Sequence, residues 1–148
     1  MHWLIRVLLF FAACARAFGG SEPGLPLKYV GGTFTPCALN SNARLYLPGS
    51  GLILRCNAHE VKVGYDKITL VRYSQTLRLS WTDIAVPEHL LLQNRSHRHF
   101  VTIEYTAAEG AKQGLILLVA QGNVRGLLAD LRARTGRPVE FEDRDPRK

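Results

Sequence analysis

The chain has 148 residues, of which 47% are hydrophobic and 21% are charged, and its formal net charge is +7. This length suits one domain with a single core, and the ordinary globular composition excludes an intrinsically disordered or low-complexity chain. The positive charge favours anionic partners such as lipid headgroups, but it also serves solubility, because the arginines are scattered along the chain.

Residues 1–17 have the pattern of a secretory signal peptide. Arg6 supplies the positive charge, residues 7–13 form the apolar core, and Ala15-Arg16-Ala17 is an A-x-A cleavage site, so we expect a mature chain that begins at Phe18. The apolar run would form only ~14 Å of helix, whereas a bilayer core is ~30 Å thick. The sequence therefore predicts export, to the periplasm or the cell envelope.

Cys14 offers a second interpretation of the same segment. Phe11-Ala12-Ala13-Cys14 is similar to a bacterial lipobox, in which the cysteine becomes the lipidated N-terminus, although Phe11 departs from the usual leucine. Lipidation and an uncleaved leader therefore stay open beside cleavage before Phe18. Removal or lipidation of Cys14 leaves Cys37 and Cys56, an even pair in an oxidising compartment, which we expect to form a disulfide. Two buried free thiols are the alternative.

The glycine- and proline-rich stretch 18–28 predicts an extended linker. After it, short apolar runs alternate with turn residues over 29–141, which indicates six or seven short strands. Two hairpins are expected, at 44–56 around Pro48-Gly49-Ser50-Gly51 and at 100–120 around Ala108-Glu109-Gly110. A further strand is expected at residues 77–81, where apolar and polar side chains alternate.

One helix is expected near residues 123–135. Asn123 is its expected cap, Asp130 and Arg134 are expected to pair, and Gly136 and Pro138 would end it. Its apolar residues recur at helical spacing and form one stripe: Val124, Leu127, Leu128 and Leu131. The fold class is therefore mainly β with one C-terminal helix, a curved sheet or open barrel capped by that helix, and a polar tail at 142–148.

Strands followed by a single C-terminal amphipathic helix resemble the pleckstrin-homology-like fold. More closely, the chain is similar to a family of uncharacterised exported bacterial proteins that carry such a domain. The matching pieces are spread over most of the chain: Tyr29-Val30-Gly31-Gly32-Thr33, Lys67-Ile68, Tyr73-Ser74-Gln75, Arg98-His99-Phe100-Val101-Thr102-Ile103, Ala133-Arg134-Thr135-Gly136 and Val139-Glu140-Phe141-Glu142-Asp143. Residues 80–95 depart from the family, which has a glycine- and alanine-rich insert there. The resemblance implies a fold and a compartment, and it implies no activity.

No residue pattern indicates catalysis, a cofactor or a structural metal. His97 and His99 could share one face of a strand, but a zinc site needs three or four ligands, and solvated polar groups at a strand edge are the simpler interpretation. Ser50 lies in a turn and lacks the strand–elbow–helix context of a G-x-S-x-G nucleophile. Nucleic acid is disfavoured for an exported chain without an aromatic–basic repeat. We therefore expect a protein that is not an enzyme.

Residues 84–98 are the expected contact surface, because apolar side chains lie beside cations, as in proteins that bind anionic membranes. The candidate contact residues are Ile84, Val86, Leu90, Leu91, Leu92, Arg95 and Arg98. Packing of these leucines into the core is the alternative. The sequence thus predicts a non-catalytic binding or scaffold module that contacts an unknown protein partner or an anionic membrane surface. A small-ligand carrier that uses the barrel mouth and an enzyme with an unrecognised site stay as alternatives, and the oligomeric state is open.

Overall fold

The computed structural model describes residues 23–75 and 98–142. The signal segment, the strand expected at 77–81 and the polar tail beyond Glu142 lie outside these residues. The elements within them are β1 (Leu25–Gly32), β2 (Ser41–Tyr46), β3 (Gly51–Cys56), β4 (His59–Gly64), the 3-10 turn η1 (Tyr65–Lys67), β5 (Ile68–Ser74), β6 (His99–Thr106), β7 (Lys112–Val119), α2 (Gln121–Thr135) and β8 (Val139–Phe141).

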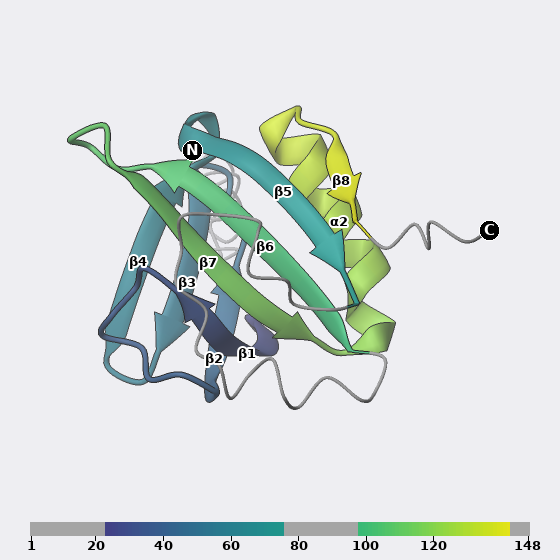
Figure 1. The fold of residues 1–148 in the computed structure, drawn as a ribbon, viewed down its shortest axis with the longest axis horizontal. Helices are drawn as coiled ribbons and strands as arrows, with labels where there is room; N and C mark the ends of the chain where they lie inside the picture. Colours follow the sequence, from purple (N-terminus) through teal and green to yellow (C-terminus); the bar gives the residue numbers. More distant parts are fainter. Residues whose placement is uncertain (1–22, 76–97, 143–148) are drawn as a thin grey trace, which may run out of the picture.

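The strands of the described part form one curved, open sheet, with α2 packed at its open side (Figure 1). Their order is β4-β3-β2-β1-β7-β6-β5-β8, and all neighbours are antiparallel except β5 and β8. This confirms the predicted class, mainly β with one C-terminal helix over a curved sheet. The described residues contain eight strands where six or seven were expected.

Both predicted hairpins are confirmed. Arg44 of β2 lies opposite Arg55 of β3, and Thr106 of β6 lies opposite Lys112 of β7. In each case turn residues separate two runs of strand-forming side chains, so the pairing is encoded locally. The central strands β6 and β7 are buried on both faces over most of their length, which explains the continuous apolar run Leu115–Val119 in β7.

The ends of several elements differ from expectation. β1 begins at Leu25, inside the predicted linker, because Leu25 pairs with Leu45 of β2. β1 ends at Gly32, and residues 33–35 form a loop. Gly32 has a φ of 127°, which suits glycine, and a Cβ there would collide with the Gly114 carbonyl oxygen.

Helix α2 has its predicted apolar stripe, and all four stripe residues are buried in the core. It begins two residues earlier than expected, at Gln121, so Asn123 lies inside the helix and Ala120 is the N-cap without a side-chain hydrogen bond. The predicted Asp130–Arg134 pair does not form among the described residues. Arg134 instead lies over the Tyr65 ring, 5.8 Å from its centroid, and donates to the Pro48 carbonyl. Gly136 ends the helix in the left-handed conformation, as expected.

One packed cluster of side chains fills the space between the sheet and α2. It includes Tyr29, Leu54, Ile103, Leu117 and Leu131, each 2% exposed or less. Tyr29 is the largest of the fully buried side chains, and its hydroxyl accepts a hydrogen bond of 3.1 Å from the backbone N–H of Phe34. Burial raises the pKa of Tyr29 from 10.0 to about 12.

The raised pKa of Tyr29 predicts a loss of stability at alkaline pH. The folded pKa of Tyr29 lies above the unfolded value, so the stabilisation from burying the neutral side chain is fully present below about pH 10. This stabilisation is lost as the pH rises toward about 12, and the loss is at most about 2–3 kcal/mol. We expect the free energy of unfolding of Tyr29→Phe to fall less over this interval than that of the parent. Denaturant titrations at pH values below and inside the interval measure both changes. Equal decreases in the two proteins would contradict the assignment to Tyr29.

Candidate functional site

A surface hollow of about 910 Å³ lies where β1 and β7 separate. The residues of β1 before Lys28 pair with β2 alone, and pairing with β7 begins only where Lys28 lies opposite Leu118. β7 stays paired with β6 to its last residue, Val119, and the start of α2 follows beside the unpaired side of β1. Pro26, Val119 and Gln121 line the opening that results.

The lining of this hollow is basic. Among residues 23–75 and 98–142 its lining contains four cationic side chains, Lys28, Arg44, Arg55 and Arg98, together with His99, and no aspartate or glutamate of these ranges belongs to it. We call these five residues the basic cluster. They come from four strands or strand ends, β1, β2, β3 and the start of β6.

Strand alternation explains why three of these cations lie on one face. Lys28, Arg44 and Arg55 are exposed, while the next residues inward, such as Leu27 and Ala43, are buried. The register then brings the exposed positions together, because Arg44 lies directly opposite Arg55. Two like charges at opposed positions destabilise a sheet, so this pair needs compensation from neighbouring groups.

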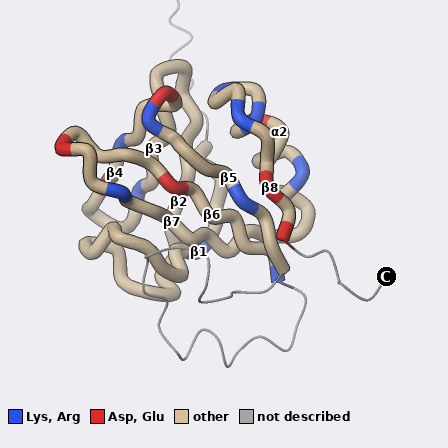
Figure 2. Tube along the Cα trace, turned by 45° about the horizontal axis from the view of Figure 1, so that its top comes forward, with Lys and Arg blue, Asp and Glu red and all other residues tan. Residues whose placement is uncertain are grey.

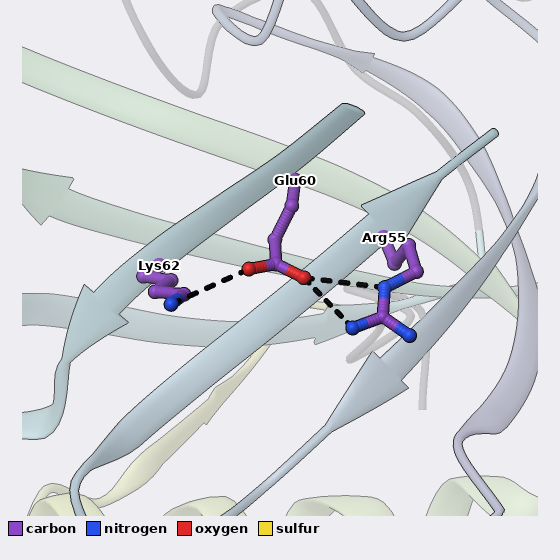
Figure 3. Close-up of polar contacts among 3 residues, drawn as sticks. All are labelled: Arg55, Glu60 and Lys62. Atoms are coloured by element: carbon purple, nitrogen blue, oxygen red, sulfur yellow. Dashed lines mark hydrogen bonds and ion pairs between the residues drawn. The ribbon is translucent and has the colours of Figure 1, made fainter. Parts of the chain in front are cut away.

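Two of these arginines have partners that hold them in place. Arg55 donates to the Glu60 carboxylate at 2.9 Å (Figure 3) and lies over the Tyr46 ring at 5.0 Å. The bond from Arg55 holds the pKa of the Glu60 carboxyl below its usual value. Arg44 donates to the Gly24 carbonyl at 3.1 Å. Glu60, the described carboxylate that is bonded to Arg55, belongs to β4 and does not line the hollow.

The first turn of α2 adds to the positive potential of the hollow. Ala120, Gln121 and Asn123 belong to its lining. The helix carries no acidic residue in its first turn, and no side chain caps its N-terminus. The N-terminal amides carry the positive end of the helix dipole, and here no anionic side chain of the helix offsets it.

A second, more apolar hollow adjoins the first between β5, β8 and α2, and both include His99 and Gln121. Its volume is about 840 Å³, and Val124, Leu128 and Val139 contribute apolar surface. Arg125 and Arg132 of α2 also line it, and Figure 2 shows basic positions along this helix.

Aromatic rings form one side of the second hollow. Phe141, which is 62% exposed, packs edge-to-face on Tyr73 with ring centroids 5.8 Å apart. The hydroxyl of Tyr73 lies 2.7 Å from Nδ1 of His99. Within the described ranges no three His, Cys, Asp or Glu side chains are grouped as metal ligands would be, and His97 lies outside those ranges.

Of the expected contact residues, only Arg98 lies among the described residues, and it lines the basic hollow. The other expected contacts lie outside the described residues: Ile84, Val86, Leu90, Leu91, Leu92 and Arg95. Sequence reasoning missed Lys28, Arg44 and Arg55. Each is a polar residue in a strand whose side chains alternate between exposed and buried, which is a weak signal in the sequence. Only the sheet register shows that these three side chains line the same hollow.

The predicted disulfide between Cys37 and Cys56 is confirmed, with Cα atoms 5.6 Å apart. It ties the β1–β2 connection to the end of β3, and both cysteines are buried. A disulfide of this kind is compatible with an exported protein.

No helix in the described part of the chain is long and apolar enough to cross a membrane. No family model and no curated protein matches the sequence, so the function has to be inferred from the geometry.

Proposed function

We propose that the protein is an exported, non-catalytic binding module that attaches to an anionic membrane surface through the basic cluster. The observation that carries this proposal is the hollow lined by Lys28, Arg44, Arg55 and Arg98, with no carboxylate among the described residues of its lining. Cations near an anionic bilayer each contribute about 1 kcal/mol to binding.

The adjoining apolar hollow favours a membrane over a freely dissolved anion. Proteins that bind an interface combine apolar side chains, which enter the acyl boundary, with cations that meet the phosphates. Exposed Phe141 and the arginines Arg125 and Arg132 supply both kinds of group next to the basic cluster. Arg98 ends the 84–98 segment for which the sequence predicts membrane or partner contact, and this one described residue of the segment lines the hollow.

The two alternatives from the sequence receive less support. A small-ligand carrier needs an empty interior, whereas the inward side chains of the sheet and α2 form one packed cluster. An enzyme needs a nucleophile or base beside its binding groups. Among the described residues that line the basic hollow, the side chains able to act in this way are Lys28 and His99, and Nδ1 of His99 is hydrogen-bonded to Tyr73.

Vesicle binding tests this proposal. We expect the purified exported protein to co-sediment with vesicles that contain phosphatidylglycerol and not with pure phosphatidylcholine, and added salt should weaken binding because exposed charges are screened. Lys28→Gln/Arg44→Gln should weaken binding by roughly tenfold or more, since two surface cations are lost. The matched control is Lys67→Gln/Lys112→Gln, which removes the same charge from the exposed residues near the opposite end of β7.

Equal losses for both double variants would show that net charge, and not the basic cluster, attracts the protein. Equal binding to neutral vesicles, or no binding to either kind, would contradict the membrane proposal and favour a protein partner. Arg98→Gln separately tests the end of the 84–98 segment and should also weaken binding.

A further inference from the structure

β4 is one edge of the open sheet, and β3 is its only paired neighbour within residues 23–75 and 98–142 (Figure 1). An edge strand presents a row of backbone N–H and C=O groups that can pair with another strand. Which residues present these groups follows from the β3–β4 hairpin. Its loop is only Asn57-Ala58, so the closing pair Cys56–His59 exchanges both hydrogen bonds.

Hydrogen-bonded pairs alternate along an antiparallel ladder, so Val61 and Val63 also direct their amide groups toward β3. Glu60 and Lys62 lie at the intervening positions and direct their N–H and C=O groups toward the free edge. Their side chains are exposed, whereas Val61 is half-buried and Val63 is buried. The edge therefore offers main-chain groups at two oppositely charged residues.

The order of these two charges is complementary to a second, antiparallel copy of the same strand. When two β4 strands pair antiparallel with Val61 on the twofold axis, Glu60 of each copy lies opposite Lys62 of the other. Both pairs then occupy hydrogen-bonded positions, and Val61 meets Val61 at a non-hydrogen-bonded position. An axis through Lys62 or through Glu60 would place like charges opposite each other, which destabilises the pairing.

The contacts within one copy are consistent with this register. The Glu60 carboxylate accepts from Arg55 with one oxygen and lies 3.5 Å from Lys62 Nζ with the other, all on the exposed face of the β3–β4 hairpin (Figure 3). In the paired arrangement Lys62 of the second copy would lie beside Glu60, on the side away from Arg55. The carboxylate would then lie between two cations from adjacent strands, one from each copy.

We propose that the protein self-associates into a twofold dimer through β4, with Val61 on the axis and Glu60 opposite Lys62 of the second copy. The dimer extends the sheet across both copies and contains two symmetry-related pairs of unlike charge. The short strand makes a small contact, so the dimer is reversible and depends on protein concentration. This inference concerns a different surface from the proposed membrane binding, because the described lining of the basic hollow contains no residue of β4, although Glu60 bonds Arg55 of the basic cluster.

A charge-swap cycle measured by sedimentation velocity tests the pairing. We expect the purified exported protein to shift from monomer to dimer as its concentration rises. Glu60→Lys and Lys62→Glu each create like-charge pairs, so each should raise the dimer Kd by roughly tenfold. The double variant Glu60→Lys/Lys62→Glu restores unlike pairs between copies and should return the Kd close to the parent value. The double variant also restores the pair between positions 60 and 62 within each copy, but that pair is present in monomer and dimer alike, so recovery of the dimer Kd reports the intermolecular pairs.

Cross-linking tests the position of the axis. Cα atoms at a non-hydrogen-bonded pair are ~4.5 Å apart, within the range of a disulfide, so Val61→Cys should form a covalent dimer on mild oxidation. His59→Cys is the matched control: its side chain is exposed on the same strand, but it lies opposite Val63 of the second copy and should not cross-link. Unfolding midpoints near the parent value establish that the variants are folded.

A parent protein that stays monomeric at all concentrations, with Val61→Cys not cross-linking, would overturn the proposal. A dimer whose Kd is unchanged by both single charge swaps would overturn the β4 interface. Cross-linking of His59→Cys in preference to Val61→Cys would overturn the register.

Discussion

Leu131→Ala is expected to lower the free energy of unfolding by ~2–5 kcal/mol, because it removes a transfer contribution and leaves a cavity. Leu131 is fully buried in the cluster between α2 and the sheet. An isolated helix of this length is marginal in water, so the burial of its apolar stripe holds α2 in place. A small domain has only about 5–15 kcal/mol of stability, so the unfolding midpoint should fall clearly. Thermal or denaturant unfolding measures the change.

Arg132→Ala is the control for Leu131→Ala. Arg132 is the next residue of α2 and is exposed, so its truncation should change the free energy of unfolding by less than about 0.5 kcal/mol. Leu128→Ala, at a stripe position that is 9% exposed, should also destabilise the protein. An unchanged midpoint for Leu131→Ala together with weakened partner binding would mean that α2 is an exposed docking helix and not part of the core.

Loss of the Cys37–Cys56 disulfide is the second large effect. The bridge spans 19 residues of sequence, and closing such a loop stabilises a domain by roughly 3 kcal/mol through the unfolded chain. We expect Cys37→Ala/Cys56→Ala to lower the free energy of unfolding by about that amount. Reductant should lower the unfolding midpoint of the parent toward that of the double variant and leave the double variant unchanged.

Thiol labelling checks the bridge directly. In unreduced, denatured protein, neither Cys37 nor Cys56 should be labelled, and both should be labelled after reduction. Two labelled thiols before reduction would contradict the disulfide and would remove its support for export. An equal effect of reductant on the parent and on the double alanine variant would show that the reductant acts elsewhere.

Some differences between the predicted and observed elements arise where tertiary contacts determine the ends of an element or the partner of a side chain. β8 was not predicted, since its three residues are too few for an alternating pattern and its position depends on parallel pairing with β5. β1 begins within a proline-containing stretch because β2 supplies a partner for Leu25. Arg134 contacts Tyr65 in place of Asp130, since η1 lies within reach of its side chain.

The candidate site shows the same division. Arg98 was identified because it follows an apolar stretch in the sequence, and it does line the basic hollow. Lys28, Arg44 and Arg55 are separated by many residues, and each taken alone is an ordinary exposed cation. No short-range pattern groups them, because their proximity is a property of the strand register.

The sequence by itself determined the class of the fold, two hairpins, the buried stripe of α2 and the cysteine pair. Turn residues and side-chain periodicity are properties of short stretches of sequence, and cysteine parity is a property of their number. These features can therefore be predicted from the sequence alone. Only the tertiary structure decided where β1 leaves β7, which cations share the hollow and which strand is left at the edge. These features depend on pairing between segments far apart in the chain, and alternation within a single strand does not specify its neighbour.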